Sequence, residues 1–105
     1  MDELRIMLCC GAGISSGFLA TAAQKAAKKA GVKATVKARS HSDVGNYMDS
    51  VDILMVGPHY KMEMPTFEKM AAPHGVPVVL IPEIVYAMID GPAIIKLAQE
   101  TLENK

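Results

Sequence analysis

Residues 6–16 read IMLCCGAGISS, an apolar run that passes directly into glycines and serines. A short continuous apolar run that ends at turn residues is typical of a strand buried on both faces, which is predicted here over Arg5–Cys9. The two glycines predict a tight turn, and Ser15 and Ser16 are of a type preferred at helix N-caps. The stretch therefore predicts a strand, a loop and a helix over about Gly17–Ala30, which Gly31 would end.

Strand and helix signals continue to alternate along the rest of the chain. Such alternation implies right-handed crossovers and a parallel sheet that helices cover on both faces. We therefore expect an α/β fold, with residues 1–105 forming a single domain of four parallel strands and the glycine-rich loop after the first strand. Further strands are predicted over Lys33–Ala38, Asp52–Val56 and Val76–Ile81. Further helices are predicted near Asp43–Met48, near Ile84–Met88 and over Pro92–Leu102. Another helix is predicted from the helical spacing of Met64, Phe67, Met70 and Ala71, with Pro65 in its first turn.

The composition is ordinary for a globular protein outside the membrane. Half of the 105 residues are apolar, and 11 Lys and Arg balance 11 Asp and Glu. Proteins that bind nucleic acid usually carry a basic excess, so the neutral charge argues against that class. The longest apolar stretches, such as Ile53–Val56 and Val76–Pro82, are far shorter than the roughly 20 residues that span a bilayer. We therefore expect no membrane insertion and no signal peptide.

The two cysteines are adjacent, at positions 9 and 10. Neighbouring strand residues point to opposite faces, so this pair cannot supply a disulfide framework or converging zinc ligands. We expect reduced thiols in the cytoplasm, with neither a metal nor a cofactor. Cys9 lies inside the apolar strand and is interpreted as a packing residue, whereas Cys10 stands at the end of the strand.

Cys10 begins a segment whose parts all suit a phosphate group. Glycines let successive backbone N–H groups point inward as an anion nest, and the N–H groups and positive dipole of a helix start add to it. Each charge-assisted hydrogen bond contributes about 1.5–3 kcal/mol, so three or four hold a dianion without an arginine. The same field would lower the pKa of the Cys10 thiol and favour the nucleophilic thiolate. Cys10 is therefore predicted to be phosphorylated, and the predicted phosphate-binding residues are Gly11, Ala12, Gly13, Ile14, Ser15 and Ser16.

The residue spacing excludes three better-known phosphate-binding loops. A tyrosine-phosphatase loop needs Arg where this chain has Ser16. The dinucleotide pattern G-x-G-x-x-G fails because Gly17 comes one residue too late after Gly13. The Walker A loop fails because its lysine is missing. A nucleophile in a phosphate cradle without an arginine clamp favours a phosphoryl carrier. Two alternatives stay open, namely a low-molecular-weight phosphatase or arsenate-reductase-like enzyme, and a noncatalytic nucleotide- or flavin-binding module.

Over nearly its whole length the chain resembles the IIB proteins of the lactose/cellobiose (chitobiose, lichenan) family of the bacterial phosphotransferase system. The resemblance rests on residues 6–16, which match a family pattern of apolar residues, Cys, a small residue and Ala-Gly-Met/Ile-Ser-Ser/Thr. It continues at the family's spacing in Val56–Pro58, Lys61–Met62, Val76–Val79 and Ile81–Pro82 with Tyr86.

The resemblance implies a phosphotransferase that works with two partners. The IIB protein would accept a phosphoryl group from a histidine of the IIA subunit onto Cys10. It would then pass the group to a sugar, a β-linked disaccharide or oligosaccharide, bound by the membrane-embedded IIC subunit. The protein would be cytoplasmic and associated with the membrane peripherally, through IIC.

Some side chains near the predicted site have open roles. His59 replaces a Gln that many family members carry, and Tyr86 either donates its hydroxyl to the phosphoryl oxygens or packs; both are candidate accessory residues. His41 and His74 receive no role. Four apolar residues at helical spacing are expected to be core rather than interface, namely Met62, Met64, Phe67 and Met70. Any of them that is exposed beside Cys10 would belong to a docking surface.

Overall fold

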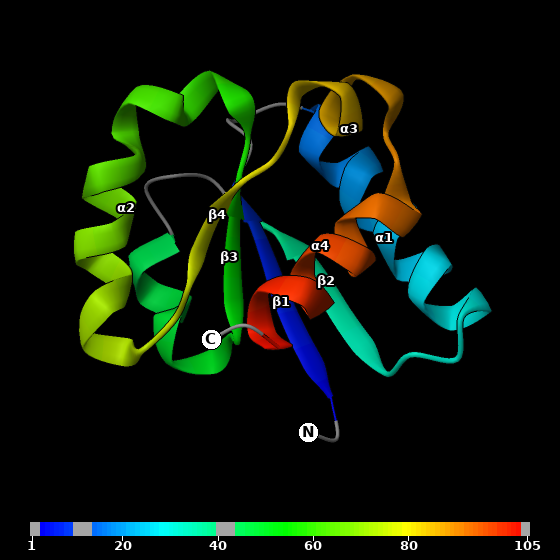
Figure 1. Ribbon diagram of the computed structural model, residues 1–105, viewed down its shortest axis with the longest axis horizontal. Coiled ribbons are helices and arrows are strands. Elements are labelled where there is room, and N and C mark those ends of the chain that lie inside the picture. The colour runs from blue at the N-terminus through cyan, green and yellow to red at the C-terminus, as the bar shows by residue number, and fades with distance from the viewer. Residues whose placement is uncertain (1–2, 10–13, 40–43, 104–105) are drawn as a thin grey trace.

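The computed structural model describes residues 3–9, 14–39 and 44–103, without the side-chain surroundings of residues 14–16. Its strands are all parallel and form one sheet in the order β2-β1-β3-β4, which confirms the expected α/β fold (Figure 1). The elements are β1 (Leu4–Cys9), α1 (Ile14–Lys29), β2 (Ala34–Ala38), η1 (Val44–Ser50), β3 (Ile53–Val56), η2 (Pro58–Glu63), α2 (Met64–Ala71), η3 (Ala72–His74), β4 (Val78–Leu80), α3 (Glu83–Met88) and α4 (Gly91–Glu103), where η marks a 3-10 helix.

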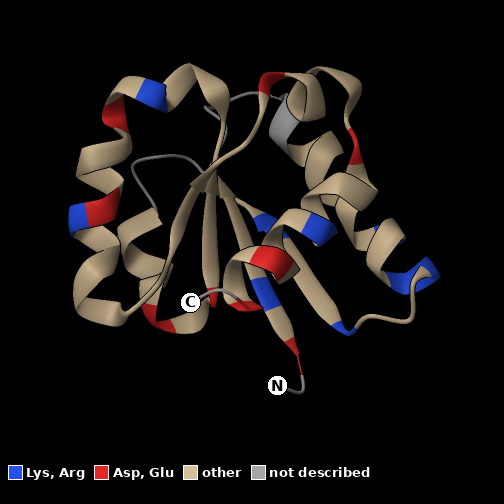
Figure 2. Ribbon diagram, viewed as in Figure 1, with Lys and Arg blue, Asp and Glu red and all other residues tan. Residues whose placement is uncertain are grey.

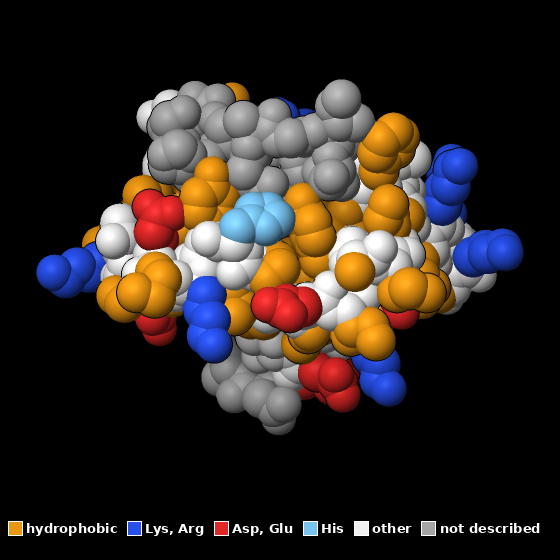
Figure 3. Space-filling model, turned by 90° about the horizontal axis from the view of Figure 1, so that it is seen from above, with side chains coloured by type: hydrophobic (Ala, Val, Ile, Leu, Met, Phe, Trp, Pro, Cys, Tyr) orange, Lys and Arg blue, Asp and Glu red, His pale blue; other side chains and the backbone are white. Residues whose placement is uncertain are grey.

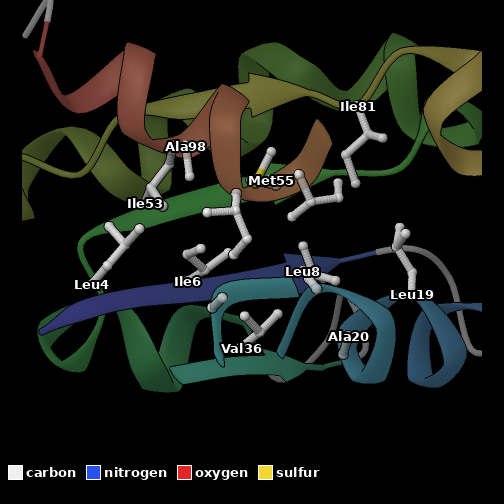
Figure 4. Close-up of a cluster of buried hydrophobic side chains, with 14 residues drawn as sticks. Leu4, Ile6, Leu8, Leu19, Ala20, Val36, Ile53, Met55, Ile81 and Ala98 are labelled. Atoms are coloured by element: carbon white, nitrogen blue, oxygen red, sulfur yellow. The ribbon is translucent and has the colours of Figure 1, made fainter. Parts of the chain in front are cut away.

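Helices cover both faces of the sheet, so the core has two layers. On one face, side chains such as Ile6, Leu8 and Met55 pack against α1 and α4 (Figure 4). On the other face, Met7 and Val56 pack against α2 and η1. Burying a side chain of this size contributes about 1.5–3 kcal/mol, which explains why the central strands are apolar at successive positions.

Helices α1 and α4 approach each other very closely at Gly91. A Cβ atom at Gly91 would lie 2.3 Å from the carbonyl oxygen of Ala22 and 2.8 Å from the backbone nitrogen of Ala23. No side chain fits there, so glycine is required by the contact between the two helices. This contact holds α4, and the α3 turn before it, against α1.

The outer edge of β2 is closed by a side chain of α1. Gln24 Nε2 donates a hydrogen bond to the Ala34 carbonyl oxygen at 2.6 Å, and the Val36 N–H donates to Gln24 Oε1 at 3.0 Å. The amide thus replaces a neighbouring strand over this part of the edge. Covering an edge in this way disfavours pairing with a second sheet.

Four local predictions need correction. Ser15 and Ser16 lie inside α1, because a cap preference of about 1 kcal/mol does not fix where a helix packed on a sheet begins. β4 is shorter than predicted and only partly buried, because it lies at the edge of the sheet. No helix was predicted between Val56 and Met64, yet Pro58–Glu63 is a 3-10 helix with proline in its first turn. Met62 is 91% exposed and is not core. Gly31 ends α1 in the left-handed conformation, as predicted.

Candidate functional site

The carboxyl edge of the sheet contains a switch point between β1 and β3. The chain leaves β1 through α1 to reach β2, and leaves β3 through α2 to reach β4, so the two connections run to opposite faces. Ligands of open α/β sheets bind in the crevice at such a point. Cys10 follows Cys9 in the sequence, and Cys9 is the last residue of β1, one of the two strands that flank this switch point.

The loop residues themselves are only partly described. Cys10, Gly11, Ala12, Gly13 and His41 lie outside the described residues, so the predictions made for them stay predictions. Ile14, Ser15 and Ser16 form the first turn of α1.

Cys9 is a packing residue, as predicted. It is fully buried in the cluster on the α2 face of the sheet. Its carbonyl oxygen accepts a hydrogen bond of 2.7 Å from the N–H of Gly57, which ties the end of β1 to the loop after β3. A fully buried thiol cannot meet a phosphoryl donor without local unfolding.

The two candidate accessory residues lie together. The rings of His59, on η2, and Tyr86, on α3, meet edge to face with centroids 4.9 Å apart and an angle of 86° between their planes. His59 also approaches Tyr60 at 5.9 Å, and Tyr60 approaches the buried Phe67 at 6.1 Å. A chain of rings therefore leads from the surface into the core, and its packing holds the exposed His59 ring at the carboxyl edge.

The field at the start of α1 suits an anion. The first turn of α1 contains no acidic residue, while Lys28 and Lys29 lie in its last turn and complement the negative end of the helix dipole. In Figure 2 the charged positions are spread over the molecule, with both signs represented. An anion at the N-terminus of α1 would therefore meet the helix dipole without an acidic side chain of that turn opposing it.

Exposed hydrophobic side chains gather around the carboxyl edge. Figure 3 looks onto this edge and shows hydrophobic side chains on both sides of a histidine. Five of the six large hydrophobic residues that are exposed among the described residues belong to α1, η2 or the α3 turn: Phe18, Met62, Ile84, Met88 and Ile89. Apolar patches of this kind are typical of interaction sites.

Sequence reasoning missed most of this surface. It expected the methionine-rich segment as core, yet only Phe67 of that set is buried, while Met64 and Met70 are partly buried. It did not single out α3, although that six-residue helix is apolar at all positions but Glu83. A helix of six residues cannot bury apolar side chains on all of its faces, so its apolar composition was the signal that some of these side chains would be exposed.

Known proteins match nearly the whole chain. A model of the family "PTS system, Lactose/Cellobiose specific IIB subunit" matches residues 5–97. A galactose-specific EIIB component from Lactococcus lactis subsp. cremoris and a cellobiose-specific one from Lactococcus lactis subsp. lactis are each 29% identical over 97% of this chain and 99% of their own length.

Two solved structures have the same fold. The cellobiose-specific IIB component from Borrelia burgdorferi has a TM-score of 0.81 at 28% identity, with 98% of this chain and 94% of that chain covered. A lactose-specific IIB domain from Streptococcus pneumoniae has a TM-score of 0.81 at 20% identity over 96% of both chains, which supports the fold alone.

The family match resolves the alternatives that the loop pattern left open. It favours the phosphoryl carrier over a phosphatase or a nucleotide-binding module. Among the residues that the structure describes, no helix is both long and apolar enough to cross a bilayer. The chain belongs to the lactose/cellobiose-specific IIB subunits of the sugar phosphotransferase system, which act as phosphotransferases that carry a phosphoryl group to a sugar.

Proposed function

We propose that Cys10 is the residue on which this subunit carries the phosphoryl group, and that the backbone from Gly11 to Ser16 binds it. The proposal is supported by the sequence position of Cys10, which directly follows β1, a strand of the switch point, and precedes the start of α1 by four residues. The adjacent Cys9 is supported as a structural residue by its complete burial. We further propose that residues 1–105 act as one phosphocysteine domain.

The proposed chemistry consists of two transfers. In the first, the Cys10 thiolate attacks the phosphorus of a phosphohistidine on the IIA subunit, so that an S–P bond forms and an N–P bond breaks. In the second, a sugar hydroxyl bound by the IIC subunit attacks the same phosphorus, so that an O–P bond forms and the S–P bond breaks. The thiolate that leaves can take up the proton that the hydroxyl loses. The N-terminus of α1 would stabilise the negative charge at each stage.

The carrier role is favoured by what the site does not contain. Phosphatases promote attack by water with an arginine on the equatorial oxygens. This loop has Ser16 where the phosphatase pattern has that arginine. A phosphocysteine held mainly by backbone N–H groups would therefore survive until a sugar hydroxyl arrives.

The proposed partners are a IIA subunit and a membrane-embedded IIC subunit. The protein would work in the cytoplasm and reach the membrane through IIC. The sugar would be a β-linked disaccharide or oligosaccharide. The exposed side chains of α1, η2 and α3 named above lie around the carboxyl edge of the sheet, and we assign them to contacts with IIA, because their apolar area would be removed from water there. His59 and Tyr86 would border the bound phosphoryl group.

The test is phosphorylation of purified variants by the IIA donor chain, with the labelled residue located by mass spectrometry. Cys10→Ser should fold and accept no phosphoryl group on a cysteine. Cys9→Ser is the matched control and should still accept it, even though a hydroxyl in an apolar cluster costs stability. Label on residue 9, or transfer that survives in Cys10→Ser, would show that the wrong sulfur has been chosen.

A further inference from the structure

A separate pocket of about 320 Å³ lies on the sheet face that β2 and β1 share with η1. Its walls include Arg5 from β1, Thr35 and Lys37 from β2, Arg39 just beyond β2, and Tyr47 from η1. This volume is within the range of small-ligand sites, which begins near 300 Å³. The described residues that line the pocket include none of those assigned to phosphoryl transfer.

The pocket exists because this face of β2 is polar. Alternate residues of a strand point to opposite faces, so Val36 faces α1 while Thr35 and Lys37 face the side of η1. Apolar packing on that side continues only as far as Met7 of β1. The polar half of the face is left partly open.

The charges in the pocket are unequal. Arg5 is paired with Asp52, at 3.0 Å from Nη2 to Oδ1, and this hydrogen bond raises the pKa of Arg5. Glu3 is hydrogen-bonded to the hydroxyl of Thr35. Within the part of the chain that the structure describes, no carboxylate pairs with Lys37 or Arg39. Lys37 and Arg39 therefore place two positive charges at the end of the pocket nearer the carboxyl edge, without a carboxylate partner among the described residues.

Arg39 is also held in place before any ligand arrives. Its guanidinium carbon lies 4.7 Å from the centre of the Tyr47 ring, and its Nη1 donates a hydrogen bond of 3.1 Å to the carbonyl oxygen of Ala38. A stacked guanidinium keeps further N–H groups in its plane for an anion. Because its rotamer is already fixed, binding an anion costs less side-chain entropy.

We propose that this pocket binds a small phosphomonoester, with Arg39 and Lys37 on the phosphate oxygens. A planar guanidinium beside an ammonium suits phosphate, which Arg binds through two parallel N–H groups. Glu3, Thr35 and Ser50 line the pocket as well and suit the hydroxyl groups of a sugar. Sugar phosphates, the products of the phosphotransferase reaction, are members of this ligand class. The proposal does not rest on the role of Cys10.

The experiment is a titration of the ¹⁵N-labelled full chain with glucose 6-phosphate, with inorganic phosphate and with glucose, followed by NMR. We expect glucose 6-phosphate to shift the amide signals of β2 and η1, inorganic phosphate to do so more weakly, and glucose not at all. Lys37→Gln and Arg39→Gln should each weaken binding of glucose 6-phosphate about tenfold or more, as the loss of one charge-assisted hydrogen bond predicts.

Lys25→Gln is the matched control, because Lys25 is an exposed lysine on α1 outside the pocket, and it should leave binding unchanged. Signals that shift only at the start of α1, or binding that Lys37→Gln and Arg39→Gln do not affect, would overturn the proposal. Phosphorylation of Cys10 by the IIA donor should persist in Lys37→Gln. Failure of the pocket proposal can therefore be told apart from failure of the carrier proposal.

Discussion

Replacing Gly91 by alanine should strongly destabilise the protein. The added methyl carbon would lie 2.3 Å from the carbonyl oxygen of Ala22 and 2.4 Å from its carbonyl carbon, far inside the ~3.5–4.0 Å at which carbon atoms pack. All three of the nearest atoms are backbone atoms of α1, so no side chain can rotate away. α4 would have to move by about 1 Å, and Ile94 and Ala98 would lose part of their packing against the sheet and α1.

Overpacking a core costs about 1–3 kcal/mol, and the upper end applies here because only backbone can give way. Alanine at the start of α4 regains at most about 1 kcal/mol in helix propensity. We therefore expect a net loss of about 2 kcal/mol, a large part of a typical 5–15 kcal/mol stability. For a chain of this size that loss lowers the midpoint of thermal unfolding by about 8–16 °C.

The assay is urea unfolding followed by circular dichroism, with linear extrapolation to water. Gly17→Ala is the matched control, because the residue lies in α1 and a Cβ there would meet no atom of the described residues within 4 Å, apart from its chain neighbours and the backbone of its own helix. That change should stabilise the chain by up to about 1 kcal/mol. If Gly91→Ala unfolded with a free energy within about 0.5 kcal/mol of the wild type, the close approach of α1 and α4 would be refuted.

Two further predictions concern the α3 turn. Ile89 has φ of 51°, a left-handed conformation that costs a residue with a Cβ about 1–2 kcal/mol. Ile89→Gly should therefore raise the free energy of unfolding by about 0.5–1 kcal/mol. An unchanged or lower free energy of unfolding would contradict the strain at Ile89. Met88 is 73% exposed, so Met88→Glu should leave the free energy of unfolding within about 0.5 kcal/mol of wild type but slow phosphorylation by IIA. Ala72→Glu is the matched control, because Ala72 is exposed on η3, and it should not slow phosphorylation. Equal rates in both variants would remove α3 from the proposed contact with IIA.

The fold was predictable because its signals are local. The apolar run over Arg5–Cys9 and the helical spacing of Phe67 and Ala71 each specify an element within a few residues. Once strands alternate with helices, the parallel sheet follows from the handedness of the connections. The position of Cys10 after the first strand could be predicted for the same reason.

Contacts between distant segments were not predictable in this way. His74 received no role from its position in a turn, yet its Nδ1 pairs with Asp49, which lies 25 residues earlier on η1. Gly91 reads as an ordinary residue before a helix, and only the approach of α1 makes it indispensable. The same holds for Arg39, whose orientation depends on Tyr47. In each case the partner is supplied by packing, which no single stretch of sequence specifies.

The two ends of the sheet differ in a way that bears on function. The amino end carries polar ties between segments, including Arg5 with Asp52 and His74 with Asp49. The carboxyl edge instead exposes Met88, and Ile89 beside it keeps a left-handed conformation that glycine would adopt without strain. The left-handed conformation of Ile89 costs stability in the isolated chain, whereas the exposed Met88 leaves apolar area in contact with water at little cost to stability. The exposed Met88 and the left-handed Ile89 at the carboxyl edge are best explained by contacts with a partner. A phosphoryl carrier must meet both its donor and its acceptor through such an edge.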